Sequence, residues 1–219
     1  MKKNMYCALG VCAFVLLSMG ACKKKSSDST TPTPSNQFTD SRDNNVYTTV
    51  TIGTQTWMAT SLKYNTSASL CPTGDCATYG VYYTYPDAKT ACPSGYHLPS
   101  DGEWQTLEYN LGMLASDTGM GYGDTLRGRA QLIGTKLQVG GSSGLNFKLS
   151  GSYFGNTSTY FPSQVGNHGY YWTSTIDPAN SSNAFVRVFD NTNVSEDYRY
   201  SISNSATNSG YLCIRCLKN

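Results

Sequence analysis

Residues 92–107 read CPSGYHLPSDGEWQTL and contain the clearest helix start in the chain. Ser100 stands where an N-cap residue belongs, and Glu103 follows three residues later. Each of these side chains is able to accept a hydrogen bond from a backbone N–H that the helix start leaves unpaired. Asp101 adds negative charge in the first turn, where the helix dipole favours it. We therefore predict a helix over residues 101–114. Its apolar face, spaced by three and four residues, would consist of Trp104, Leu107, Leu111 and Leu114.

The rest of the domain reads mainly as strands and loops. The β-branched run at residues 46–52 predicts a strand, and Pro86 opens a short helix that ends near Cys92. Asp190-Asn191-Thr192-Asn193 is typical of a hairpin turn. Further strands are predicted at residues 57–59, 81–85, 147–154, 170–175, 184–189, 195–201 and 211–217, with a short helix within 130–139. A strand, two helices and then a run of antiparallel strands indicate an α+β fold.

Five segments resemble a known family in the order in which they occur. Residues 92–107 resemble the signature of the Fibrobacter succinogenes major paralogous domain, which usually reads CP-x-GWHLPS-x-x-EW-x-x-L. Tyr96 stands where that family commonly has Trp. The other four segments are IGTQTWMA at 52–59, YGVYYTY at 79–85, YYWTST at 170–175 and IRC at 214–216. The resemblance spans residues 46–219. This family is abundant on bacterial cell surfaces, but the resemblance implies no particular activity.

The resemblance also implies a fold. The element order is similar to the C-type-lectin-like fold, in which two short helices pack on antiparallel strands with long loops. Formylglycine-generating enzymes share that fold and often open its second helix with R-L-P-T-x-x-E-W, comparable to the segment from His97 to Trp104 here. The cysteine pair that serves as the site of those enzymes has no recognisable counterpart in this chain.

The first residues are typical of an exported lipoprotein. Lys2 and Lys3 precede an apolar stretch at residues 8–19, which is too short to span a bilayer comfortably. Met19-Gly20-Ala21-Cys22 resembles a bacterial lipobox, so Cys22 would carry the lipid, although an ordinary signal peptide with an incidental cysteine is the alternative. Lys23 after the cysteine resembles outer-membrane sorting. We expect a signal peptide at 1–21, the lipidated cysteine and linker at 22–38, and the domain at 39–219.

Composition limits the possible partners. Residues 23–38 contain mainly Lys, Ser, Thr and Pro, as solvated linkers do. The formal net charge of the 219-residue chain is +2, and it falls to zero once Lys2 and Lys3 leave with the signal peptide. Without a basic stripe, nucleic acid is not an expected partner. The membrane is the expected partner, through the N-terminal lipid.

Five cysteines remain in the predicted domain, so at least one thiol is free unless the chain dimerises. Cys71 and Cys76 flank the turn sequence Pro-Thr-Gly-Asp, where a local disulfide is expected. A Cys92–Cys216 disulfide would join the start of the helix to the last strand, and it matches the usual staple of the resembled fold. Cys213 would then be unpaired. A zinc site at Cys213-x-x-Cys216 is the alternative, but a second pair at suitable spacing is missing.

Tyrosine is abundant, with 17 Tyr against 7 Phe, and Tyr, Ser, Gly and Asn together suit adaptable binding loops. The loops before and between the late strands form the variable face of the resembled fold. We therefore expect a ligand there, although these residues also suit half-exposed strands. The candidate ligand-binding residues are Tyr153, Tyr160, Phe161, His168, Asp177 and Asn180.

Catalytic and metal motifs are not recognisable in the sequence. His97 and Glu103 are better explained as helix-start residues than as an acid–base pair. The lectin tripeptides that bind calcium and sugar are missing, although Asp190, Asn191, Asn193, Glu196 and Asp197 are close in sequence. We expect no metal and no cofactor. The favoured function is a lipid-anchored surface binding or adhesion module for glycan or protein. The alternatives are a carbohydrate-active or other enzyme and a structural envelope component.

Overall fold

The computed structural model describes residues 36–71, 74–121, 126–154, 159–160, 164–192, 197–205 and 210–219. All of them lie within one compact unit, Pro34–Asn219. Within these ranges, no helix is both long enough and apolar enough to cross a membrane. Predictions for the signal peptide, for Cys22 and for most of the linker lie outside the described residues.

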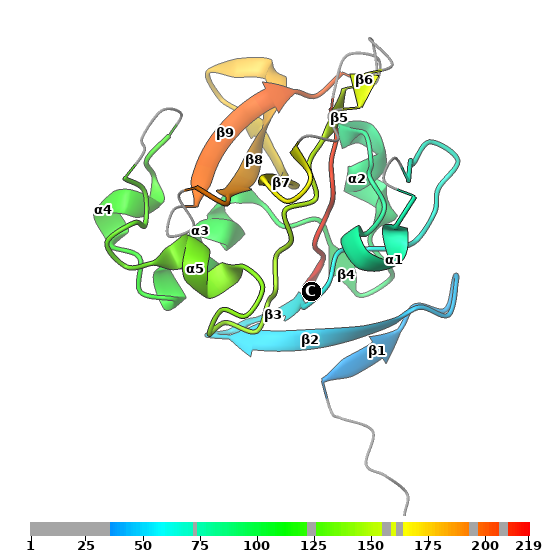
Figure 1. Ribbon diagram of the computed structural model, residues 1–219, viewed down its shortest axis with the longest axis horizontal. Coiled ribbons are helices and arrows are strands. Elements are labelled where there is room, and N and C mark those ends of the chain that lie inside the picture. The colour runs from blue at the N-terminus through cyan, green and yellow to red at the C-terminus, as the bar shows by residue number, and fades with distance from the viewer. Residues whose placement is uncertain are drawn as a thin grey trace, which may run out of the picture. The chain divides into compact units, whose positions relative to one another are not determined.

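One antiparallel sheet brings the first and the last described strands together (Figure 1). Its strand order is β1-β2-β3-β11-β4. The predicted strand at residues 46–52 is β2, in which the β-branched run turns Tyr47 and Thr49 inward. The strands are β1 Gln37–Thr39, β2 Val46–Ile52, β3 Gln55–Met58, β4 Tyr96–His97 and β11 Leu217–Lys218.

Strand β1 begins inside the segment that the sequence assigned to the linker. Phe38 stacks on Tyr47 and Tyr96, with ring centroids 5.3 and 4.3 Å apart. A linker residue with an aromatic ring to bury gains free energy by pairing with the sheet edge. Phe38 falls in the predicted linker because the residues before it are mainly Ser, Thr and Pro.

A second antiparallel sheet has the order β7-β8-β9, and a third, smaller one has the order β10-β5-β6. In the second sheet, Asp177 of β7 pairs with Asn180 of β8, so Pro178 and Ala179 make a tight turn that the sequence reading missed. The predicted turn at 190–193 leads out of β8, but residues 193–196 lie outside the described part. The strands are β5 Tyr153–Phe154, β6 Thr159–Tyr160, β7 His168–Asp177, β8 Asn180–Asp190, β9 Tyr198–Ser203 and β10 Gly210–Tyr211.

The helices are short; in Figure 1, α3, α4 and α5 lie on one side of the molecule and α1 and α2 on the other. They are α1 Cys76–Tyr79, α2 Tyr85–Ala91, α3 Asp101–Asn110, α4 Ala115–Thr118 and α5 Ile133–Leu137. The predicted capping box is present at α3. The Ser100 hydroxyl accepts from the Glu103 N–H at 3.2 Å, and the Glu103 carboxylate accepts from the Ser100 N–H at 2.7 Å.

Helix α3 ends four residues earlier than predicted. Gly112 has φ +99° and turns the chain, a conformation that side chains other than glycine rarely adopt. As a result Met113 enters the core, while Leu114 is 55% exposed. The predicted apolar face is correct for Trp104 and Leu107, and wrong for Leu114.

Three predicted strands are shorter than expected. Only Tyr82 and Tyr83 of the 81–85 segment form isolated bridges, because Tyr85 already belongs to α2. In the 147–154 segment, Gly151 has φ +71° and interrupts the extended chain before β5. The predicted last strand, 211–217, is likewise divided between β10 and β11.

Two clusters of buried apolar residues fill the interior. Trp172 anchors the first, together with residues of β2, α2 and β8. Trp57 and Trp104 anchor the second, and their ring centroids lie 5.0 Å apart. All three tryptophans are buried. Side chains alternate along β8, so Val186 and Val188 enter the first cluster and Phe189 enters the second. The β7-β8-β9 sheet therefore separates the two clusters.

The predicted disulfides are both present. Cys71 is bonded to Cys76, and Cys92 is bonded to Cys216 across a sequence separation of 124. Cys213 is a buried free thiol, and burial raises its pKa to about 12. A zinc site at Cys213-x-x-Cys216 is therefore excluded, because the Cys216 sulfur is bonded to Cys92. The architecture of short helices with antiparallel sheets is α+β.

Candidate functional site

Three carboxylates and three arginines lie together between α3 and the β7-β8-β9 sheet. Arg187 of β8 donates to Glu108 at 2.5 Å and to Asp101 at 2.7 Å. Arg199 donates to both oxygens of Asp101 at 2.8 Å, and Arg127 pairs with Glu108. We call this set the charge cluster; its members are Asp101, Glu108, Asp197, Arg127, Arg187 and Arg199.

The protonation states of the charge cluster follow from its pairing. Burial would raise the pKa of Asp101, but Arg199 and Arg187 outweigh it and lower that pKa to about 2. Glu108 also has a lowered pKa, because Arg187 and Arg127 outweigh its burial. Burial and the nearby Glu108 charge raise the pKa of Asp197 well above its usual range. The Asp101 and Glu108 carboxylates are thus paired with arginines inside the protein. None of the six side chains lines the tyrosine groove or the Arg215 cavity, the two cavities defined in the following paragraphs.

A groove of about 420 Å³ lies on the opposite face of the same sheet. Sheet register places Tyr170, Val188 and Tyr198 in one row across three strands, and Val186 pairs with Tyr200 in the next row. Alternation along each strand puts these residues on one face. We call this surface the tyrosine groove; it is lined by His168, Tyr170, Val186, Val188, Asp190, Tyr198, Tyr200, Ser201 and Ile202.

His168 and Asp190 supply the polar end of the tyrosine groove. They are paired across β7 and β8, and His168 Nε2 lies 3.0 Å from an Asp190 carboxylate oxygen. His168 Nδ1 is buried and has no hydrogen-bond partner. Burial raises the pKa of Tyr170, whose ring centroid lies 6.1 Å from that of His168. The groove therefore combines aromatic faces with a carboxylate, an imidazole and hydroxyl groups.

The six predicted ligand-binding residues do not form one site. His168 lies in the tyrosine groove, at the start of a strand rather than in the expected loop. Asp177 and Asn180 lie at the far end of the same sheet, roughly 30 Å away at about 3.3 Å per strand residue. There each side chain accepts a backbone N–H two residues on, from Ala179 and Ser182. These contacts stabilise the tight turn.

The remaining predicted residues belong to the third sheet or lie outside the described part. Tyr153 of β5 is half-buried and packs on Tyr211 with ring centroids 5.6 Å apart. Tyr160 of β6 pairs with Tyr153 through the backbone, but its side chain and all of Phe161 lie outside the described residues. The structure therefore leaves the predicted role of Tyr160 and Phe161 open.

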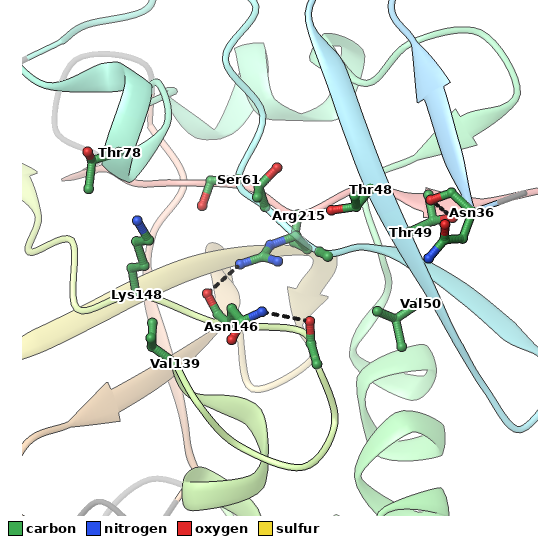
Figure 2. Close-up of a pocket in the computed structure, with 13 residues that line it drawn as sticks. Asn36, Thr48, Thr49, Val50, Ser61, Thr78, Val139, Asn146, Lys148 and Arg215 are labelled. Atoms are coloured by element: carbon green, nitrogen blue, oxygen red, sulfur yellow. Dashed lines mark hydrogen bonds between the residues drawn. The ribbon is translucent and has the colours of Figure 1, made fainter. Parts of the chain in front are cut away.

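A second cavity, of about 470 Å³, lies beside β2 and α1 (Figure 2). We call it the Arg215 cavity. Threonine and serine hydroxyl groups are prominent in its lining, and Arg215 and Lys148 are its two cationic residues. The lining residues are Asn36, Thr48, Thr49, Val50, Ala59, Thr60, Ser61, Thr78, Val139, Gly144, Asn146, Lys148 and Arg215.

Neither cavity shows a metal site. The described residues contain no group of three or more His, Cys, Asp or Glu side chains suited to hold a metal ion. The acidic residues near 190–197, which were considered as calcium ligands, lie in different parts of the structure. Asp190 lies in the tyrosine groove and Asp197 in the charge cluster, whereas residues 193–196 lie outside the described part.

Comparison with known proteins identifies the family. The model of the Fibrobacter succinogenes major domain matches residues 50–218. Because this match covers well over half of the chain, the protein belongs to that family. Neither the curated proteins nor the solved structures include a match to the chain.

Proposed function

We propose that this protein is a lipid-anchored binding module of the bacterial outer membrane, and that its ligand is a glycan held in the tyrosine groove. The anchor rests on the lipobox-like sequence around Cys22 and the linker behind it. The ligand class rests on the groove. These two parts of the proposal are independent, and each can fail alone.

The observation that carries the ligand assignment is the set of partly exposed tyrosines beside a His–Asp pair. Tyr170 and Tyr200 are half-buried, so part of each ring faces the groove. Tyrosine offers a flat apolar face together with a hydroxyl group, as the alternating C–H and O–H groups of a sugar ring require. Asp190 and Ser201 add polar groups at the rim. A volume of about 420 Å³ lies within the range of small-ligand sites.

A C-type-lectin-like topology would agree with this function, and we propose it for the domain. In its support, the first and last described strands share one sheet, and the Cys92–Cys216 disulfide ties the end of α2 to the chain just before β11. The second sheet lies across α2 and α3: the Tyr85 hydroxyl donates to the Ser174 carbonyl at 2.8 Å, and the Asp101 N–H donates to Thr175 at 2.9 Å.

The other function classes find less support. A glycosidase needs two carboxylates facing a cleft about 5–10 Å apart, whereas Asp101 and Glu108 face buried arginines. A protein ligand would use the same aromatic surface, and it is one outcome of the test below. A purely structural envelope component would require neither cavity.

A glycan array probed with the purified full-length chain tests the proposal. We expect binding to defined glycans and its loss in Tyr200→Ala, with Tyr153→Ala as the matched control because Tyr153 lies outside the groove. Melting temperatures of both variants separate lost binding from lost folding. Binding that survives Tyr200→Ala but disappears in Tyr153→Ala would move the site to the third sheet. A chain that binds no glycan but captures one envelope protein through Tyr200 would replace glycan by protein.

A further inference from the structure

Within the part of the chain that the structure describes, Arg215 is a buried cation without a counterion. Its residue is 1% exposed, and one terminal nitrogen donates to the carbonyl oxygens of Met58 and Leu145 at 3.0 and 2.6 Å. The other donates to the Asn146 carbonyl at 3.5 Å, and Nε has no hydrogen-bond partner. None of the ion pairs found among the described residues includes Arg215.

Aromatic rings compensate part of the Arg215 charge. The guanidinium carbon lies 4.2 Å from the Phe147 ring centroid and 5.9 Å from that of Tyr171. Such contacts are weakly stabilising compared with a carboxylate at hydrogen-bond distance. A charge removed from water is costly unless it is paired. Among the described residues, the Arg215 charge therefore has no negative partner.

The Arg215 cavity has room for that partner. Figure 2 shows the guanidinium in the middle of the lining residues, with Ser61 and Thr48 on one side and Asn146 on the other. The described residues of the lining include five hydroxyl side chains and no Asp or Glu; the hydroxyl residues are Thr48, Thr49, Thr60, Ser61 and Thr78. Hydroxyl groups can donate to an anion without bringing charge of their own.

Lys148 adds a second positive charge at the cavity wall. Its side chain is partly exposed, and its Nζ lies 5.9 Å from the Tyr79 ring centroid. Lys148, Thr78 and Val139 also line a neighbouring cavity of about 340 Å³. The two hollows therefore meet at Lys148, which leaves space for a ligand larger than a single ion.

We infer that the Arg215 cavity binds an oxyanion group, a carboxylate, sulfate or phosphate, carried by a small polar molecule. Lys148 contacts the anion directly, the hydroxyl groups donate to it, and Arg215 supplies positive potential from the cavity floor. Low local dielectric strengthens this attraction relative to the surface. The inference does not depend on the tyrosine groove, which lies on other strands.

Calorimetric titration of the full-length chain tests the inference at constant ionic strength. The probes are inorganic sulfate, inorganic phosphate, galacturonate and, as the neutral control, galactose. We expect at least one oxyanion probe to bind and galactose not to bind in this cavity. Stronger binding of galacturonate assigns a carboxylated sugar, whereas stronger binding of sulfate or phosphate assigns the free ion or its ester.

Two matched variants locate the site. Lys148→Met removes the cavity lysine, and Lys89→Met removes an exposed lysine of α2 that also lies near a tyrosine ring, at 5.2 Å from Tyr85. We expect Lys148→Met to weaken oxyanion binding about tenfold, the effect of one charge-assisted hydrogen bond, and Lys89→Met to change it less than about twofold. Tyr200→Ala should leave it unchanged. Equal losses in both lysine variants, or no binding of any oxyanion at millimolar concentration, would overturn the inference.

Discussion

Arg187 and Arg215 are equally buried, yet their surroundings differ. Arg187 contacts two carboxylates, Asp101 and Glu108. Arg215 has no carboxylate partner among the described residues, and it contacts carbonyl oxygens and aromatic residues. Carboxylate partners neutralise a buried cation and join it to the surrounding structure. A buried cation without such partners keeps an uncompensated positive charge. In this protein that charge lies at the floor of a cavity, so the same residue type holds the fold together in one region and attracts ligand in another.

The pKa values of Arg187 and Arg215 shift in opposite directions, in agreement with this contrast. Burial alone would lower the pKa of Arg187, but Glu108 and Asp101 raise it above its usual range. For Arg215 burial dominates, and its pKa is lowered. Both guanidinium groups remain charged near neutral pH, because the ordinary arginine pKa is far above it. Substitutions in each of the two regions therefore measure what this contrast contributes to the free energy of unfolding.

Glu108→Gln should give the largest loss of stability. Glu108 is fully buried and accepts from Arg187 and Arg127, so its neutralisation leaves two guanidinium groups short of a counterion. Removal of one partner from a buried pair typically costs about 3–5 kcal/mol. Denaturant unfolding followed by tryptophan fluorescence measures the change. A loss below about 1 kcal/mol would show that water or Asp197 replaces the missing charge.

Asp101→Asn should cost about 2 kcal/mol at neutral pH, and this cost should depend on acid. The folded pKa of about 2 lies below the unfolded value of about 3.9. A carboxyl group whose pKa is lowered in the folded state contributes its full stabilisation above the unfolded pKa. This contribution disappears as the pH falls through the folded pKa of about 2. The free-energy difference between wild type and variant should therefore shrink between about pH 4 and pH 2. A difference that stays constant with pH would assign the effect to packing.

Only the difference in the free energy of unfolding between wild type and Asp101→Asn is informative, because the pKa of Asp197 shifts in the opposite direction to that of Asp101. Its raised pKa favours the folded state at low pH, and that contribution is lost as pH rises through the folded pKa. Asp197 is present in both proteins, so its contribution largely cancels unless the two groups are strongly coupled.

Arg215→Met should lower the free energy of unfolding by about 1 kcal/mol, less than either substitution in the charge cluster. The substitution abolishes two well-formed hydrogen bonds to carbonyl oxygens, each worth about 1 kcal/mol, but it also removes the cost of an uncompensated buried charge. Denaturant unfolding checks the value beside Glu108→Gln. If Arg215→Met proves as destabilising as Glu108→Gln, the carbonyl groups and rings suffice as partners, and the contrast with Arg187 fails.

Local signals predicted the helix start and the Cys71–Cys76 disulfide well. The Ser100–Glu103 box and the β-branched run at 46–52 act over a few residues, so their outcome depends little on the rest of the fold. The Cys92–Cys216 pairing came from family resemblance. The end of α3 was missed because the backbone of Gly112 overrides the apolar spacing that continues to Leu114.

Long-range arrangements were not predictable in the same way. The charge cluster joins residues separated by up to 98 positions, and no local pattern shows that Arg187 and Asp101 meet. For the tyrosine groove a signal existed: Tyr198 and Tyr200, like His168 and Tyr170, stand two residues apart, as side chains on one strand face do. The predicted site rested on the abundance of tyrosine in the loops and not on this period. Arg215 was noticed only as part of a family motif.

His97 of the signature offers the smallest expected effect and a third kind of pair, at the surface. Its Nε2 lies 2.9 Å from Glu103 Oε1 and its Nδ1 lies 2.6 Å from Asn219 Oδ1, but both partners in the His97–Glu103 pair are about one-third exposed. Solvent screens such pairs, so His97→Ala should cost less than about 1 kcal/mol. Glu103→Ala, which also removes the capping box, should cost more, up to about 2 kcal/mol. Thermal unfolding of the two variants side by side measures the order. Should His97→Ala keep its stability and yet lose glycan binding, the ligand would lie at the signature and the tyrosine groove would no longer be the proposed site.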